Sequence, residues 1–158
     1  VILVLMKLST ALLAAAICTS AQAQDVAVFP AKVSQVYRVR LEKDAGLLES
    51  ITSIIQKHGI KDGAVLTAVG ALATCTYHGV GGGKQTVAEP MEINSLGGII
   101  ANGEPHIHVM LTNAKRGAFG GHLENGCKVG NRVELTLAQF GGDALERKQG
   151  ALEKKGSK

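Results

Sequence analysis

The chain has 158 residues, of which 46% are hydrophobic and 19% charged, and this composition excludes an intrinsically disordered protein. Three Phe, two Tyr and no Trp leave few flat side chains on which bases could stack, which argues against a single-stranded nucleic-acid binder. The formal net charge of +4 is mild and offers little capacity to neutralise phosphates.

Residues 1–23 have the features of a secretory signal peptide. Lys7 supplies the positive charge, an apolar run follows over Leu8–Ile17, and Ala21-Gln22-Ala23 matches an A-x-A cleavage site. A membrane anchor is the alternative, but Lys7 divides the apolar stretch, and about 20 continuous apolar residues are needed to span a bilayer. We therefore expect cleavage and a periplasmic or secreted protein.

Export would place Cys75 and Cys127 in an oxidising compartment. A disulfide between them would close a long loop and restrict the unfolded chain. The alternative is a pair of small buried thiols, because Cys75 lies in an apolar, strand-like run. The sequence leaves both possibilities open.

The first part of the mature chain predicts an extended lead-in, a strand and a helix. Residues 24–34 form the lead-in, and alternating apolar and polar residues predict a half-buried strand over Val36–Glu42. Apolar residues at helical spacing predict a helix over Ala45–His58, with Asp44 as its N-cap and Gly59 at its C-terminal end.

The rest of the domain, which we expect to span residues 35–141, predicts short strands. They are expected at Ala64–Gly70, Ala71–His78, Thr86–Asn94, Leu96–Ala101, His106–Thr112 and Val129–Phe140. Gly79–Gly83 is expected to be a flexible turn, Pro90 to interrupt its strand, and Asn102-Gly103 to form a hairpin turn.

Two segments predict little regular structure. Residues 113–121 are expected to form a loop, and residues 142–158 a basic C-terminal tail that is disordered or a frayed helix. One helix and about seven short strands predict an α+β fold with a largely antiparallel sheet. Because the domain has so few aromatic residues, we expect it to complete its burial by forming an oligomer.

Three histidines could bind a metal. His106 and His108 stand two apart in a predicted strand, so their side chains project from one face, about 7 Å apart at the backbone. His122 follows two glycines where the backbone could bend towards them. Three imidazoles with an open fourth position suit Zn²⁺, although imidazole also binds other divalent metals. The alternative is three surface histidines on an exposed strand.

Other polar residues could support this site. Glu104 could orient a histidine from the second shell of ligands, although a solvated turn residue is the simpler interpretation. His78 could join the site if its strand lies next to the strands that carry the other histidines.

The stretch from Tyr37 to Phe140 resembles the PPC domain, the plants and prokaryotes conserved domain also called DUF296 or the PD1-like DNA-binding domain. The resemblance is carried in order by a helix ending HGIKDG and by the segments AVLTAVGALATCTYHG, MEINSLGGII and GEPHIHVMLTNAKRGAFGGHLENGCKV. It covers nearly the whole mature domain.

The resemblance implies an α/β fold on an antiparallel sheet, assembled as a homotrimer. It also implies that His106, His108 and His122 hold a metal close to a subunit boundary, and for this chain we expect a divalent metal, zinc before others. Plant members of the family carry AT-hook motifs and act in the nucleus, whereas this chain contains no Arg-Gly-Arg-Pro hook.

Three functions follow as hypotheses. The first is an exported trimeric protein whose three-histidine metal site binds a small ligand or a protein partner. The second is a metal-dependent hydrolase, for which Glu104 is the carboxylate close in sequence that we select as general base. The third is DNA binding, as the family label suggests.

Overall fold

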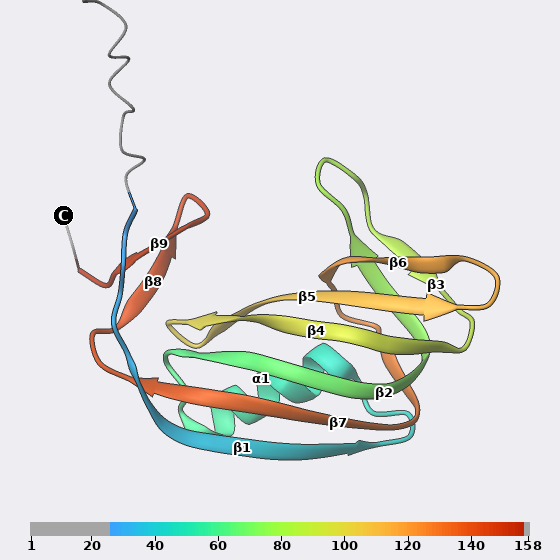
Figure 1. The fold of residues 1–158 in the computed structure, drawn as a ribbon, viewed down its shortest axis with the longest axis horizontal. Helices are drawn as coiled ribbons and strands as arrows, with labels where there is room; N and C mark the ends of the chain where they lie inside the picture. Colours follow the sequence, from blue (N-terminus) through green and yellow to red (C-terminus); the bar gives the residue numbers. More distant parts are fainter. Residues whose placement is uncertain (1–25, 157–158) are drawn as a thin grey trace, which may run out of the picture.

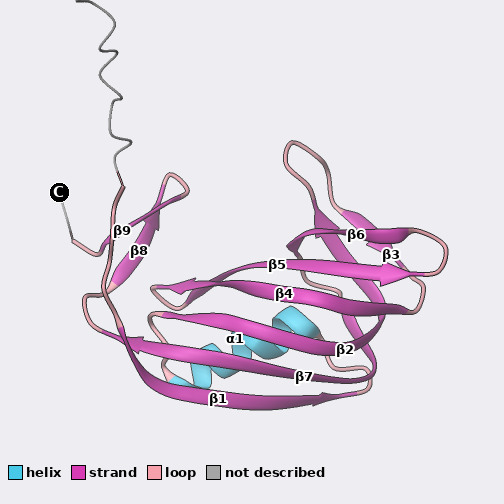
Figure 2. Ribbon diagram, viewed as in Figure 1, coloured by secondary structure: helices cyan, strands magenta, loops and turns pink. Residues whose placement is uncertain are grey.

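The computed structural model describes residues 26–156 of the chain. The expected signal peptide, residues 1–23, lies outside the described residues. Within residues 26–156 the chain forms one helix and nine strands, shown in Figures 1 and 2. They are β1 (Lys32–Glu42), α1 (Leu47–His58), β2 (Gly63–His78), β3 (Gln85–Val87), β4 (Met91–Ala101), β5 (Glu104–Asn113), β6 (Gly117–Leu123), β7 (Lys128–Gly141), β8 (Leu145–Lys148) and β9 (Ala151–Lys154).

Seven of these strands form one antiparallel sheet in the order β1-β7-β2-β4-β5-β6, with β3 paired to β2. Strand β2 is long enough to pair with β4 and β7 along its first part and with β6 at its end. Strands β2, β4, β5 and β6 therefore close on themselves, which brings β6 beside the end of β2 as well as beside β5.

Helix α1 packs against one face of the sheet (Figure 1). Its buried residues Leu47, Ile51 and Ile55 recur at helical spacing, so they form one apolar face. The strands turn alternate residues towards this helix, for example Ile107, Val109 and Leu111 of β5. The predicted α+β class and antiparallel sheet are confirmed. The single helix of residues 26–156 is too short to cross a bilayer.

Both ends of the helix can be compared with the prediction. Gly59 adopts the left-handed conformation, with φ 62°, as a helix-terminating glycine is expected to do. The predicted N-cap is wrong: the cap is Gly46, which makes no side-chain cap, and Asp44 has a φ of 68°. Asp44 instead belongs to the turn after β1, where its backbone N–H donates to the carbonyl oxygen of Val129.

Several predicted strand boundaries are also wrong. The two strands predicted over residues 64–78 are one strand, β2, which bends at Gly70 where its register with β7 shifts. The interruption expected at Pro90 is confirmed, because it separates β3 from β4, but β4 runs on to Ala101 and includes the strand predicted separately over Leu96–Ala101. Neighbouring strands supply hydrogen-bond partners on both sides, so a local break in pattern does not end a strand.

Two segments expected to be irregular form strands. Residues 117–123, most of which were expected to be loop, form β6, whose glycines allow close pairing with β5. Residues 145–154, expected to be disordered or a frayed helix, form the β8–β9 hairpin beside the main sheet. Both strands of the hairpin carry neighbouring charges of opposite sign, a composition that is also typical of a solvated tail.

Candidate metal centre

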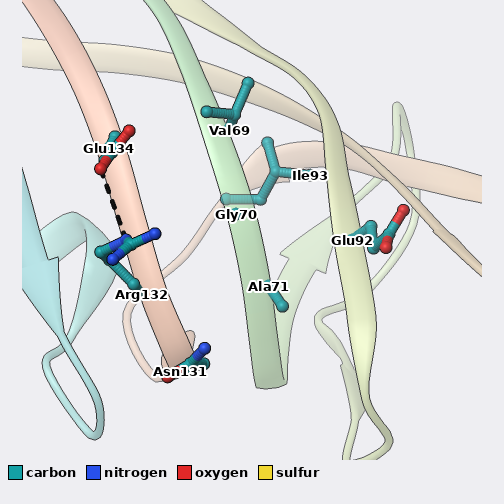
Figure 3. Close-up of a pocket in the computed structure, with 8 residues that line it drawn as sticks. All are labelled: Val69, Gly70, Ala71, Glu92, Ile93, Asn131, Arg132 and Glu134. Atoms are coloured by element: carbon teal, nitrogen blue, oxygen red, sulfur yellow. Dashed lines mark ion pairs between the residues drawn. The ribbon is translucent and has the colours of Figure 1, made fainter.

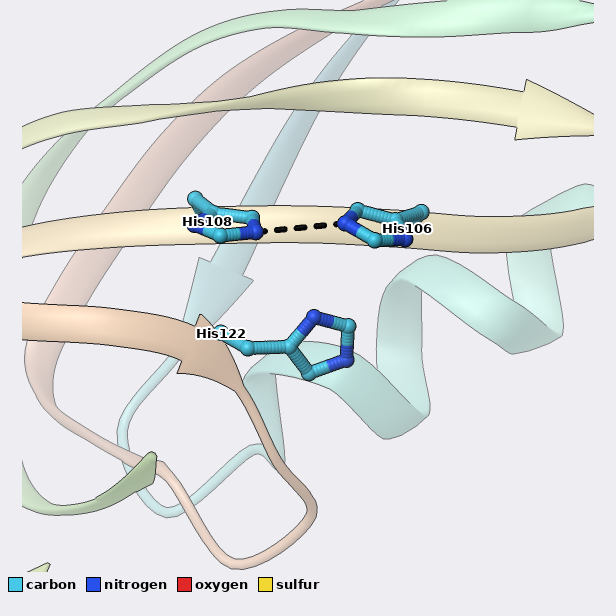
Figure 4. Close-up of side chains that lie close together, drawn as sticks. All are labelled: His106, His108 and His122. Atoms are coloured by element: carbon cyan, nitrogen blue, oxygen red, sulfur yellow. Dashed lines mark hydrogen bonds between the residues drawn. The ribbon is translucent and has the colours of Figure 1, made fainter. Parts of the chain in front are cut away.

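Three histidine rings converge on the face of the sheet that points away from α1. His106 and His108 alternate with the inward-facing Ile107 on β5, so both side chains project outward. Strand β6 is paired to β5 with His122 directly opposite His108. The closure of the sheet therefore brings the third ring to the other two, as Figure 4 shows. The sequence prediction that these three histidines lie together is consistent with this geometry.

The distances between the rings suit a shared metal ion. The Nε2 atoms of His106 and His108 lie 3.2 Å apart, and one ligand nitrogen from each of the three residues lies within 4.8 Å of the others. Zinc–nitrogen bonds of about 2.05 Å in a tetrahedron place ligand nitrogens about 3.3 Å apart. The Nε2 atoms of His106 and His108 therefore already have the spacing of metal ligands. Small side-chain rotations of His122 would bring its ring nitrogen to the same spacing.

The surroundings favour neutral histidines, which is the form that binds a metal. Burial lowers the pKa of His106 below its usual 6.5, and the positive charge of Arg147 and the other two histidines lower it further. Burial also lowers the pKa of His122, with His78, His108 and Lys84 acting in the same direction and Glu124 opposing them. A bound proton therefore competes weakly with a metal at these two rings.

The metal-free protein is expected to lose stability as the pH falls. Because the folded state lowers the pKa of His106 and His122, the unfolded chain binds more protons below about pH 6.5. Stability present above that pH is lost as the pH falls through the folded-state pKa values. Urea unfolding between about pH 7.5 and about pH 5 measures this slope. The double variant His106→Gln/His122→Gln should flatten it, and an unchanged slope in that variant would contradict the assignment.

A fourth histidine and a carboxylate lie beside the cluster. His78, at the end of β2, is paired with His122, and their ring centroids are 4.6 Å apart. Glu124 contacts His78 through an Oε1–Nδ1 distance of 2.8 Å and Lys84 through an Oε2–Nζ distance of 2.8 Å. The hydrogen bond from Lys84 is the main reason that the pKa of Glu124 is lowered, so this carboxylate stays ionised.

This neighbourhood was only partly predictable from the sequence. The proximity of His78 was expected if its strand lay adjacent, and it does. Glu124 was missed, although its position two residues after His122 was the available signal. Glu104, the predicted second-shell residue, lies exposed at the first position of β5, and the described groups that could hold a metal together do not include it.

Two glycines allow the close approach of β6 to its neighbours. A Cβ atom at Gly120 would collide with the carbonyl oxygen of Val109 on β5, and a Cβ at Gly121 with that of His78 on β2. Any larger residue would push β6 away from one of these strands. The Gly-Gly pair before His122 therefore sets the distance at which the third ring meets the other two.

In the structure Cys75 and Cys127 form a disulfide between the second half of β2 and the residue before β7. Both residues are fully buried in the apolar core, and 52 positions of the chain separate them. Thr76 donates its backbone N–H to the sulfur of Cys127 at 3.2 Å. The disulfide thus anchors the part of β2 that ends at His78, while its formation in the cell stays a prediction.

Comparison with known proteins agrees with the fold. Residues 29–141 match the family model of the Plants and Prokaryotes Conserved (PCC) domain. The chain belongs to the PCC family. The match ends before β8, so the β8–β9 hairpin lies outside the PCC domain of this chain.

Two solved structures are similar to this chain over most of their length. A plant- and prokaryote-conserved protein from Pyrococcus horikoshii is 26% identical, with 84% of this chain and 99% of that chain covered and a TM-score of 0.68. A metal-containing protein from Archaeoglobus fulgidus is 27% identical, with 79% of this chain and 94% of that chain covered and a TM-score of 0.67.

A curated relative is much longer. The bifunctional protein GlmU of Synechococcus sp. strain JA-2-3B'a(2-13) is 28% identical over 120 residues, which is 75% of this chain and 19% of that protein. This chain therefore spans about a fifth of the length of the curated relatives it matches.

Proposed function

We propose that this PCC protein binds a divalent metal, zinc above all, through His106, His108 and His122, and uses the bound ion to capture a small ligand or a protein partner. The observation that carries the proposal is the convergence of three imidazoles from two paired strands, all within reach of one ion. The proposal is also supported by the similar protein from Archaeoglobus fulgidus, which is named as metal-containing. The ion would supply Lewis acidity and an open coordination position.

Metal content tests this proposal directly. Protein purified without chelators and without an affinity metal is expected to contain about one metal ion per chain, with three His ligands supplied by that chain. Inductively coupled plasma mass spectrometry measures the content and identifies the metal. Protein that carries no stoichiometric metal, and takes up none when zinc is added, would refute the proposal.

Ligand capture is better supported than hydrolysis. A hydrolase would need a free base close to the metal-bound water. Glu124 is the carboxylate that contacts the histidine cluster, through His78, and it is already engaged by Lys84. Glu104 is exposed and lies outside the cluster. A hydrolase panel run with and without chelator distinguishes the two functions, since chelator-sensitive turnover would favour the enzyme.

DNA binding, the other alternative, is distinguished by a gel shift at physiological salt. If the protein is exported, as residues 1–23 suggest, it does not meet chromosomal DNA. Tight binding that persists at physiological salt, together with retention of an intact tagged chain in the cytoplasm, would favour DNA binding over ligand capture.

We also propose that the protein is a homotrimer whose subunits meet through the sheet face opposite α1. Four exposed apolar side chains lie on that face: Leu66 and Val69 of β2, Ile99 of β4 and Met110 of β5. Ile99 is paired with His106, so the apolar surface borders the histidine cluster. The same face contains a hollow of about 410 Å³ at the bend of β2, where Arg132 and Glu134 form an ion pair of 3.4 Å (Figure 3).

A charge on this face should dissociate the trimer. Val69 is 58% exposed in a single subunit, and Val69→Glu would place a carboxylate where an apolar contact is expected. Light scattering after size exclusion is expected to give the mass of one chain for this variant and of three for the wild type. Val80→Glu is the matched control, because Val80 is fully exposed in the glycine loop. A wild type that is monomeric would contradict the proposal.

A further inference from the structure

The β8–β9 hairpin carries an arginine towards the histidine cluster. In the hairpin, Arg147 is paired with Leu152 and shares a face with Leu145 two positions earlier. All three of these side chains are half-buried, whereas the hairpin tip is exposed. Glu146 and Glu153 on the opposite face are half-buried as well, so both faces of the hairpin are partly covered.

Two hydrogen bonds fasten this hairpin next to the start of β5. Lys155 donates from Nζ to Oδ1 of Asn102, in the turn between β4 and β5, at 2.8 Å. The backbone N–H of Leu145 donates to Oδ1 of Asp62 at 3.0 Å. Asn102 lies four residues before His106, and β8 also contacts β4, the strand whose Ile99 is paired with His106, so the hairpin lies beside the strands that carry and flank His106. The positive charge of Arg147 accordingly contributes to the lowered pKa of His106.

Arg147 differs from the other charged residues of the hairpin. Asp143 pairs with Lys154, and Glu146 and Glu153 pair with Lys148 at 3.2 Å and 3.8 Å. Across residues 26–156, no carboxylate pairs with Arg147, whose guanidinium donates from Nη1 to the carbonyl oxygen of Gly150 at 3.3 Å. Most of its five N–H donors remain available.

An unpaired guanidinium next to a divalent metal ion is electrostatically unfavourable unless an anion lies between them. Carboxylate and phosphate groups suit this position, because one oxygen can bind the metal while another accepts a charge-assisted hydrogen bond from arginine. Building on the proposed metal site, we propose that its ligand is a small molecule carrying an oxyanion, a carboxylate or a phosphate, and that Arg147 binds that group. The hairpin lies outside the PCC domain, so this specificity belongs to the chain's own C-terminal addition.

The test uses Co²⁺ as the metal probe, with acetate and inorganic phosphate as the anion probes. Metal-free full-length protein is loaded with Co²⁺ in a non-coordinating buffer, and the visible absorption of the ion is followed during each anion titration. The wild type is expected to show a saturable spectral change with at least one anion, and the tighter of the two identifies the group. Arg147→Gln should weaken that binding about tenfold or more, because a charge-assisted hydrogen bond is lost.

The same variant should bind Co²⁺ more tightly than the wild type when no anion is present, since a neighbouring positive charge has been removed. A merely structural role for Arg147 would instead weaken both kinds of binding. Lys148→Gln is the matched control, because it removes one positive charge from the opposite face of the same strand. Arg147→Lys keeps the charge and should retain part of the anion affinity.

Several outcomes would overturn the inference. One is equal anion affinity in the wild type and Arg147→Gln, and another is an equal loss in Arg147→Gln and Lys148→Gln. A wild type that binds Co²⁺ but neither anion would also refute it while leaving the metal site intact. A wild type that binds no Co²⁺ would refute the proposed function itself, so the two failures are distinguishable.

Discussion

The variant His122→Ala is expected to lose metal affinity by on the order of 100-fold or more. Changes to residues that merely support metal ligands typically cost about 10–100-fold, and a direct ligand should cost at least as much. His122 joins the cluster to both neighbouring strands, because it lies opposite His108 on β5 and beside His78 on β2. Isothermal titration with zinc measures the affinity of each form.

A thermal measurement gives an independent readout of the same loss. Metal at about 100 times its dissociation constant stabilises the native state by about 2.7 kcal/mol, which raises the melting temperature of a domain of this size by roughly 5–10 °C. The wild type should show this shift and His122→Ala should not. His58→Ala is the matched control, because His58 lies at the end of α1 in contact with the ring of Tyr37, away from the cluster. Equal shifts in all three proteins would contradict the three-histidine site.

Reduction of the Cys75–Cys127 disulfide is expected to lower the free energy of unfolding by about 4 kcal/mol. In the chain-entropy model the effect grows with the length of the closed loop, and the two cysteines are 52 positions apart. Both sulfurs lie in the core beside the last part of β2. We therefore expect reduction to loosen the end of β2, where His78 lies. Urea unfolding with and without reductant measures the difference.

The double variant Cys75→Ala/Cys127→Ala separates the disulfide from side effects of the reductant. Its stability should lie below that of the oxidised wild type and should not respond to reductant. Mass spectrometry after alkylation without reductant should find no labelled cysteine in the wild type. Two labelled cysteines, or a wild-type unfolding midpoint that reductant leaves unchanged, would contradict the disulfide.

The fold was predictable where local pattern and tertiary environment agree. The alternation of His106 to Thr112 and the apolar periodicity of α1 each describe an element with one buried face, and both elements are present. The beginning of the helix was not predictable in the same way. Asp44 is a favourable N-cap by type, but the hydrogen bond that its backbone N–H donates to Val129 places it in a preceding turn.

Strand β6 shows why glycine-rich strands escape prediction. Gly117, Gly120 and Gly121 are typical of a loop, yet here Gly120 and Gly121 permit close pairing to β5 and β2. The need for glycine comes from carbonyl oxygens on other strands, and those contacts depend on a register that the sequence does not reveal. The same register decides that His78 meets His122.

The residues of the candidate site also fall into two groups, those that the local sequence pattern reveals and those that it does not. Three histidines could be selected because two stand at strand spacing and the third follows a Gly-Gly pair. Glu124 stands two residues after His122, but its contact with His78 depends on the pairing of β2 with β6. Arg147 lies in a hairpin formed by a segment that was expected to be irregular. Side chains that surround a site from distant elements require the tertiary structure.

Anomalous diffraction at a metal absorption edge tests the central claim most directly. Crystals of protein purified without chelators are measured on both sides of the zinc edge, with chelator-treated protein as the control. We expect one anomalous peak per chain between His106, His108 and His122, with nitrogen–metal distances of about 2.0–2.1 Å, and no peak after chelation. Native crystals without a peak between these three rings, or with the metal bound elsewhere, would contradict the three-histidine centre.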